Sequence, residues 1–334
     1  MWTPARSRRR CWIAGASSVR LASLLVLSVC AATAWAQSYP AKPVRVVVPY
    51  PAGTTPDLIG RTLAERLQRA MAQPFVVENR SGAGGNIGTE AVVKAPADGY
   101  TLLVGGNGPV AINRHLYKSL SYDPERDLAP ISLLASAPQL LVAKNQFQDF
   151  NSLVQHARQN PGRLSYASVG AGSASHLTME LLKSGARVDL VHVPYRGFPP
   201  AVTDLLSGNI DAMFAIIPAV LPQVRAGKMK ALAVTALQRS AMSPDVPSVA
   251  ELGLPSLESL AWNGLLAPAG TAPEILARLS AETVKGMRHP EAQEALGKLG
   301  FEVVASSPEE FARWIRAESE KWAAVIRASG ATAD

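Results

Sequence analysis

Cysteine is almost absent from this chain, and Cys11 and Cys30 are its only two examples. Both fall within residues 1–36, which have the pattern of a cleaved export signal. Residues 37–334 therefore offer no thiol for a disulfide, a nucleophile or a metal. The five histidines form no HExxH motif and no close pair in sequence. We therefore expect neither a bound metal nor a cofactor.

Acidic residues are missing from the first 36 positions. A basic start with four arginines precedes a largely apolar stretch at 13–32 and an A-x-A cleavage pattern at 34–36. This order is typical of a secretory signal peptide, which would leave Gln37 as the first exported residue. The pair Arg8 and Arg9 leaves twin-arginine export open.

An excess of positive charge is also missing once this signal is set aside. The whole chain has 33 Lys and Arg against 26 Asp and Glu, and five of the arginines precede residue 37, which leaves 28 against 26. Such a balance does not predict a nucleic-acid partner. No later window reaches 18 uninterrupted apolar residues, so no further membrane span is expected.

Short β-branched runs alternate with helical patterns along the chain, which predicts parallel sheets covered by helices. We expect an α/β fold with two lobes, each a mainly parallel sheet covered by helices, with residues 37–138 plus 262–334 as domain 1 and 139–261 as domain 2. The stretch at 131–143 should form two strands broken around Pro138, and 260–267 should return to the first lobe. The tail predicts helices at 273–288 and 308–328 around a strand at 301–304.

Three Gly-rich or Pro-rich loops follow strands and precede helices, where backbone N–H groups can hold an anion. Loop one (residues 49–57) is stiffened by two prolines, and we expect Thr55 at its N-cap. Loop two (79–88) lacks the glycine spacing of a dinucleotide site. Loop three (168–176) offers Ser173 as a cap, but it lacks the G-x-S-x-G pattern of a serine hydrolase.

Two further positions are candidates with open alternatives. Arg196 follows a predicted strand and could hold a carboxylate through a charge-assisted fork, or could simply be solvated. Trp262 begins the returning strand and could line a cleft or belong to the core, and we favour the cleft.

Several motifs together resemble the Bug family, the periplasmic receptors of tripartite tricarboxylate transporters. They are P-Y-P-A-G-x-x-x-D at 49–57, V-E-N-R-x-G-A-G-G-N-I-G at 77–88, D-G-Y-T-L-L at 98–103, Y-A-S-x-G-x-G-S-x-S-H-L at 166–177 and H-V-P-Y-R-G at 192–197. The likeness covers about residues 40–330 in the same order.

The resemblance implies a periplasmic, non-catalytic and monomeric receptor of the type II, or Venus-flytrap, class that closes on a small carboxylate. Membrane permease subunits are its implied partners, and loops one and three would grip one ligand carboxylate. The implied ligand-binding residues, together with Arg196 and Trp262, are Tyr50, Ala52, Gly53, Thr54, Thr55, Asp57, Asn107, Ala171, Gly172, Ser173, Ser175 and Ala215. Closure would occur at a hinge near 137–141 and 259–262.

Two departures from the family pattern bear on the ligand. Thr54 stands where the family commonly has glycine, and Ala215 stands where it often has aspartate. Without that acid, we expect a carboxylate with an apolar or aromatic remainder rather than an amino acid. An exported esterase acting through Ser173 or Ser175, and an orphan receptor used as a sensor or adhesin, remain as alternatives.

Overall fold

The computed structural model describes residues 1–2 and 39–333. The chain divides into two units, Met1–Ala41 and Lys42–Asp334, and the description that follows concerns the second. The predicted signal sequence with its cleavage site lies outside the described residues, apart from positions 1 and 2. Within the residues that are described, no helix is both long and apolar enough to cross a membrane.

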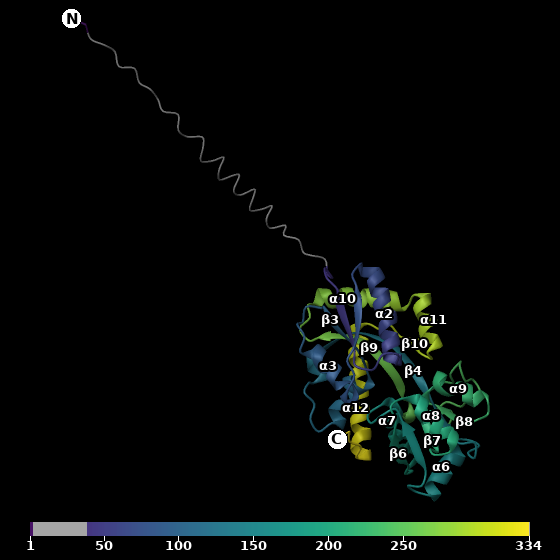
Figure 1. The fold of residues 1–334 in the computed structure, drawn as a ribbon. Helices are drawn as coiled ribbons and strands as arrows, with labels where there is room; N and C mark the ends of the chain where they lie inside the picture. The colour runs from purple at the N-terminus through teal and green to yellow at the C-terminus, as the bar shows by residue number, and fades with distance from the viewer. Residues whose placement is uncertain (3–38, 334) are drawn as a thin grey trace. The chain divides into compact units, whose positions relative to one another are not determined.

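Ten strands form one sheet in the described part of the chain, in the order β2-β1-β3-β9-β4-β7-β5-β6, with β8 and β10 also paired to β4 (Figure 1). The strands are β1 (Val44–Val48), β2 (Phe75–Asn79), β3 (Thr101–Gly106), β4 (Leu128–Ala143), β5 (Ser165–Ser168), β6 (Val191–Pro194), β7 (Ala212–Ile216), β8 (Lys230–Val234), β9 (Leu260–Pro268) and β10 (Glu302–Val303). The helices are α2 (Thr55–Met71), α3 (Asn86–Val93), α4 (Asn113–Leu116), α5 (Pro124–Asp127), α6 (Phe150–Gln159), α7 (Ala174–Ala186), α8 (Phe198–Ser207), α9 (Ile217–Arg225), α10 (Pro273–Met287), α11 (Pro290–Lys298) and α12 (Pro308–Ser329), with short turns η1 (Ala83–Gly85), η2 (Gly108–Ile112) and η3 (Pro255–Leu257).

The first lobe is built on the parallel strands β1, β2 and β3, because α2 and α3 carry the chain back between them. Val46 pairs with Val77 on one side and with Leu102 on the other. The valines of β1 are buried on both faces, as expected for a strand covered by helices. β9 and β4 extend this sheet in the antiparallel sense.

The second lobe repeats this construction with β5, β6 and β7 in parallel, and β4 pairs antiparallel with both β7 and β8. Its side chains alternate between two cores. Phe214 packs with residues of α6 and α7, whereas Met213 and Ala215 pack with residues of α8 and α9. Both lobes therefore have the predicted α/β character, and the parallel run of strands ends at β9 in the first lobe and at β4 in the second.

β4 is one strand of 16 residues, so the prediction of two strands broken around Pro138 was wrong. Pro138 pairs with Leu260 of β9, and the next residue, Gln139, pairs with Ile216 of β7. The strand therefore leaves one ladder and enters the other at the proline. A residue without an N–H is tolerated where the ladder changes partner, and the chain continues through it.

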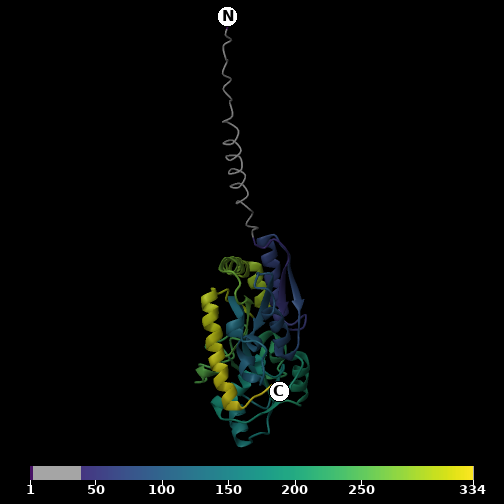
Figure 2. The same cartoon turned by 90° about the vertical axis from the view of Figure 1, so that its left-hand side faces the viewer.

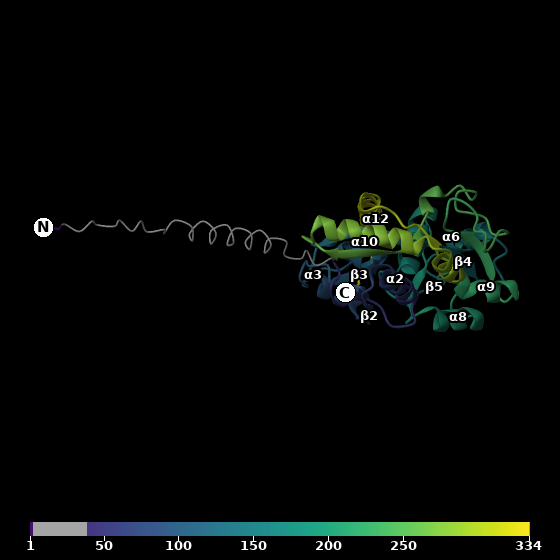
Figure 3. The ribbon, with the colours of Figure 1, turned by 90° about the horizontal axis from the view of Figure 1, so that it is seen from above.

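α12 contacts both lobes. Its first turns place Phe311 and Ile315 in the core of the first lobe, and Trp322 packs with Ile112 and with Leu177 of α7. A capping box between Ser307 and Glu310 fixes its start. Figure 2 shows α12 as the yellow helix along one side of this unit, and Figure 3 shows α3 at one end and α8 and α9 at the other.

The sequence also predicts a Gly-rich turn at 105–109 and a short helix at 89–94, and the structure differs at both places. Gly105 and Gly106 belong to β3, and residues 108–112 are helical rather than a turn. α3 begins at Asn86, three residues before position 89. α11 was not predicted, although Pro290 stands at its first turn, where proline is favoured.

Candidate functional site

Loop one leads into α2, whose N-cap is Thr54, one residue earlier than expected. The Thr54 hydroxyl donates to the Pro51 carbonyl at 2.6 Å and makes no cap bond to the helix. Gly53 has φ of +78°, which favours glycine, and its N–H donates to Asp57 Oδ2 at 2.8 Å. The loop is therefore folded back onto the first turn of its own helix.

Asp57 holds this arrangement together from a buried position. Its carboxylate accepts hydrogen bonds from Arg61 Nε at 3.0 Å and Asn79 Nδ2 at 2.9 Å, besides Gly53 N. Burial raises the pKa of this carboxyl, but the hydrogen bonds from Arg61, Gly53 and Asn79 outweigh it and hold the pKa below its usual value. Asn79 Nδ2 also donates to the Tyr50 carbonyl, so loops one and two are tied through the same pair.

Several N–H groups of loop one donate to no acceptor among the described residues. These belong to Ala52 and to Thr55 and Asp57 in the first turn of α2, where an α-helix leaves donors unpaired. Ala52 and Gly53 are exposed, and Thr54 and Thr55 are half-buried. Donors of this kind at the N-terminus of a 17-residue helix favour an anion.

Loop three enters α7 in a similar way. Ser173 is its N-cap, as predicted, and its hydroxyl accepts from His176 N at 3.3 Å. Ser175 is buried, and its hydroxyl accepts the Val169 N–H at 3.1 Å and lies 3.1 Å from Ser173 Oγ. The N–H groups of Ala171, Ala174 and Ser175 have no acceptor within the described residues, so this helix also presents unpaired donors.

Asn113 is bonded to loop two and lies close to loop three, and these contacts were not predicted from the sequence. It is buried, and its Nδ2 donates to the Gly84 carbonyl at 3.2 Å and to Asn86 Oδ1 at 2.6 Å, both from loop two. Asn113 Oδ1 also lies close to two glycines. If Gly172 carried a Cβ atom, that atom would be 3.4 Å from Asn113 Oδ1. A Cβ atom on Gly108 would be 3.5 Å from Asn113 Oδ1 and 3.6 Å from the Tyr50 hydroxyl. Asn113 therefore lies between the Tyr50 side chain of loop one and Gly172 of loop three.

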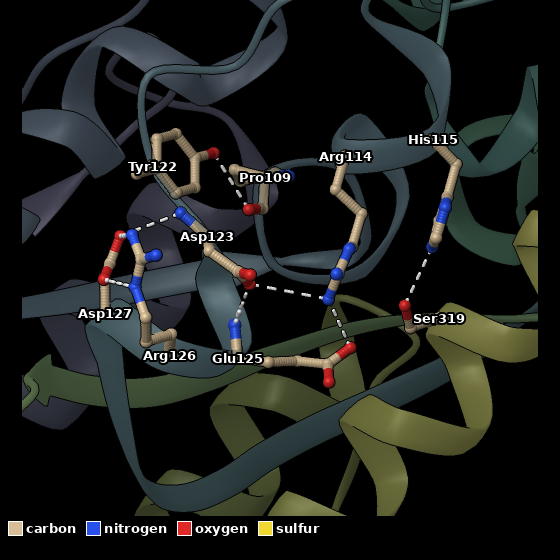
Figure 4. Close-up of polar contacts among 9 residues, drawn as sticks. All are labelled: Pro109, Arg114, His115, Tyr122, Asp123, Glu125, Arg126, Asp127 and Ser319. Atoms are coloured by element: carbon tan, nitrogen blue, oxygen red, sulfur yellow. Dashed lines mark hydrogen bonds and ion pairs between the residues drawn. The ribbon is translucent and has the colours of Figure 1, made fainter.

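The residues after Asn113 are fixed by polar contacts (Figure 4). Arg114 Nη1 lies 2.6 Å from Glu125 Oε1 and 3.5 Å from Asp123 Oδ1. His115 Nε2 lies 2.9 Å from Ser319 Oγ of α12. The Tyr122 hydroxyl donates to the Pro109 carbonyl at 2.9 Å, which holds the start of η2. Asn113 is thus anchored to α5 and α12 through its neighbours.

Asn107 and Trp262 lie in the interior, next to α12. Asn107 Nδ2 donates to the Leu260 carbonyl, and its Oδ1 accepts the Trp262 N–H, both at 3.0 Å. The Trp262 side chain is 1% exposed, and its indole donates to Glu318 Oε2 at 3.0 Å. The structure therefore places Trp262 in the core and not on a cleft wall, and these two residues support the position of β9.

The remaining predicted positions lie on β7 or just after β6, the two strands that pair with β5 on either side. Arg196 is exposed and makes no ion pair within the described residues. The Ala215 side chain is buried in the second-lobe core. Neighbouring Ile216, at the end of β7, is half-buried. In the part of the chain that is described, no group of three His, Cys, Asp or Glu residues could hold a metal ion.

Comparison with known proteins identifies what these loops belong to. The model of the tripartite tricarboxylate transporter family receptor matches residues 59–331. The chain belongs to this family. Protein BugT of Bordetella pertussis is 38% identical over 306 residues, which span 90% of this chain and 93% of BugT. The resemblance to the Bug family is therefore confirmed.

Two solved structures have the same fold as this chain. A protein of R. palustris solved with adipate is 35% identical with a TM-score of 0.79, covering 88% of this chain and 99% of that protein. MatC from Rhodopseudomonas palustris with bound malate is 33% identical with a TM-score of 0.76, covering 86% of this chain and all of MatC. The chain is a solute-binding receptor with the two-lobed α/β fold that was predicted.

Proposed function

We propose that this receptor works in the periplasm, where it captures a small carboxylate between loops one and three for membrane permease subunits. The observation that carries the proposal is the presence of unpaired N–H groups at the first turns of both α2 and α7, beside Asn113. A carboxylate accepts several such bonds at once and gains from both helix dipoles. The adipate and malate found in the two related structures are small dicarboxylates, in line with this chemistry.

The expected affinity follows from the number of these donors. Each hydrogen bond to a charged group contributes about 1.5–3 kcal/mol before the cost of closure. Three or four such bonds supply about 5–12 kcal/mol before the cost of ordering the ligand and closing the lobes, so we expect a binding free energy no more favourable than about −8 kcal/mol, which is micromolar.

We further propose that the ligand has an apolar or aromatic remainder. The strand end at Ala215 and the helix that follows carry no ionisable side chain from residue 212 to residue 224. Ile216 is the half-buried side chain there, and Ile217 is buried. A ligand ammonium would find no carboxylate at this position, so an amino acid would lose a charged partner that a plain carboxylate does not need.

Lobe closure would use the two strands that run between the sheets. β4 changes ladder between Pro138 and Gln139, and β9 pairs with β4 as far as Leu260. We propose domain boundaries at 138/139 and 261/262, which are next to these positions. A hinge needs only a few residues that absorb changes in backbone angle, and the point at which β4 passes from one ladder to the other offers such residues.

The esterase alternative would need an exposed serine next to a base. The Ser173 and Ser175 hydroxyls instead cap α7 and bond within loop three, and Ser175 is buried. Turnover of an activated ester that disappears in Ser173→Ala would favour an esterase. An orphan receptor or sensor would differ only in its protein partner.

A calorimetric screen tests the proposed function. We expect adipate, other alkyl dicarboxylates or benzoate to bind and to raise Tm by mass action, with aspartate and glutamate much weaker. Tight binding of aspartate or glutamate alone would contradict the apolar remainder. Failure of every carboxylate to bind would contradict the receptor function itself.

A further inference from the structure

Three aromatic rings are stacked beside loop three. Tyr166 of β5, His192 of β6 and His176 of α7 lie with ring centroids 4.9 Å apart for Tyr166 and His192 and 4.1 Å apart for His192 and His176. His176 is only 4% exposed. Neither histidine belongs to the predicted ligand contacts, so the stack calls for a separate explanation.

His176 contacts the backbone of loop three directly, and His192 contacts it through the Ser168 side chain. The Gly172 N–H donates to His176 Nδ1 at 3.1 Å. His192 Nε2 lies 2.6 Å from Ser168 Oγ, which accepts the Gly170 N–H at 3.1 Å. Gly170 and Gly172 have φ of +125° and +74°, so these contacts hold the two glycines in conformations that glycine alone adopts easily. The stack therefore supports the shape of the loop.

The contact at Gly172 determines the chemical state of His176. Because Nδ1 accepts a hydrogen bond, the ring proton lies on Nε2 and the imidazole is neutral. Burial, with smaller contributions from His192 and Lys183, lowers the pKa of His176 to about 3. Burial also lowers the pKa of His192, although Glu180 opposes this and Lys183 adds to it.

The charged groups around the stack compensate one another. Glu180 Oε1 accepts the Tyr166 hydroxyl at 2.6 Å and Lys183 Nζ at 3.0 Å. Lys183 Nζ also lies 3.8 Å from Asp189. Glu180 is therefore already paired, and within the described residues no carboxylate acts to raise the pKa of His176. A second imidazolium on His192, 4.1 Å away, would repel it.

We infer that His176 is a positioning residue for ligand recognition: its neutral ring binds the Gly172 N–H and so leaves Ala171, Ala174 and Ser175 to present their N–H groups to the ligand. This inference rests on the proposed function. Protonation would turn the Nδ1 acceptor into a donor facing another donor, and Gly172 would be released. Because the ring stays neutral, the loop keeps its shape in mildly acidic surroundings.

The test compares His176→Leu, which fills the space without an acceptor, with His176→Asn, whose side-chain oxygen can take the place of Nδ1 and does not titrate. His156→Asn is the control, since His156 is exposed on α6. Hydrogen exchange of the Gly172 amide is followed by NMR without ligand, and binding of adipate and malate is measured between pH 8 and pH 4. Thermal melting checks that each variant is folded.

We expect Gly172 exchange to be about tenfold faster in His176→Leu, with affinity about tenfold weaker, as the loss of one hydrogen bond implies. His176→Asn should restore both, and His156→Asn should change neither. In the wild type, Nδ1 should stay unprotonated in the histidine ¹⁵N spectrum down to about pH 4.

Two results would overturn the inference. One is Gly172 exchange that is unchanged in a folded His176→Leu protein, and the other is a wild-type His176 that protonates above about pH 6. If neither dicarboxylate binds even the wild type, the choice of probe or the proposed function fails. The Gly172 exchange still decides whether His176 holds the loop.

Discussion

The side-chain oxygens of Thr178 and Ser259 lie 2.6 Å apart, which joins α7 to the residue just before β9. Gln139 Nε2 donates to Thr178 Oγ1 at 2.9 Å, and Thr235 Oγ1 donates to the Ser259 carbonyl at 2.5 Å. All four residues are buried. The helix that begins at loop three is therefore bonded, one turn later, to the strands on which the proposed hinge depends.

Replacing Thr178 with valine should destabilise the protein, because it leaves Gln139 and Ser259 without a buried partner. The expected loss is about 1–3 kcal/mol in the free energy of unfolding, measured with denaturant. Thr283→Val is the matched control: Thr283 is also buried, but its hydroxyl has no partner among the described residues. A Thr178→Val protein as stable as this control would show that the bond to Ser259 contributes nothing.

Proline substitutions can remove single N–H groups from the proposed grip. Thr55 and Ala174 each occupy the first position of their helix, where proline is tolerated, and each follows a residue in extended conformation. Thr55→Pro and Ala174→Pro should each weaken carboxylate binding about tenfold or more, as the loss of one bond to a charged group implies, with little change in Tm.

Alanine or glycine at these positions separates the amide from the side chain. Thr55→Ala and Ala174→Gly keep the N–H and should bind within about threefold of the wild type, since no hydrogen bond to the ligand is lost. Calorimetry with adipate makes the comparison. Equal affinity in the proline and amide-retaining variants would exclude these N–H groups from the site.

Asp57→Asn should loosen loop one and reduce stability in a pH-dependent way. The folded-state pKa of Asp57 lies below its usual value, so its contribution is complete above the unfolded pKa of about 4 and is lost as the pH falls through the folded value. The stability difference between wild type and variant should therefore be about 1–3 kcal/mol at pH 7 and shrink below about pH 4. Urea unfolding at a series of pH values measures it, and a difference that grows in acid would contradict the assignment.

Asn113→Leu should affect both the fold and the site. It removes the bonds to Gly84 and Asn86 and places branched carbons close to Gly172. We expect a loss of about 1–3 kcal/mol in stability together with much weaker ligand binding. Asn86→Leu is the comparison variant, because it removes the bonds from Asn113 and from the Tyr122 hydroxyl but adds no carbons next to Gly172. Equal ligand affinity in the two variants would indicate that Asn113 has a purely structural role.

The sequence predicts those parts of the fold whose signals are local. The valine run of β1, the prolines and glycine of loop one and the serine cap of α7 each specify their structure through neighbours in the chain. The continuity of β4 was not predictable. A proline interrupts a strand when the same partner strand continues past it, but β4 changes partner from β9 to β7 at Pro138, and this change is visible only in the structure.

The interior position of Trp262 was also beyond sequence reasoning. It depends on Glu318, 56 residues later in the chain. The contacts of Asn113 and the stacking of His176 and His192 were not predicted for the same reason, since their partners come from separate elements. Loop residues at the ends of strands could be named from the sequence, but which of their polar groups remain unpaired follows only from the tertiary structure.

The carboxylate of Glu318 accepts hydrogen bonds from two indoles, those of Trp262 and Trp322, each at 3.0 Å. Trp314 lies on the same helix and packs against the first-lobe core. These three are the only tryptophans after residue 36. The intrinsic fluorescence of this part of the chain thus originates beside the strands that join the two lobes, and a change in emission on adding ligand would report movement there without any attached dye.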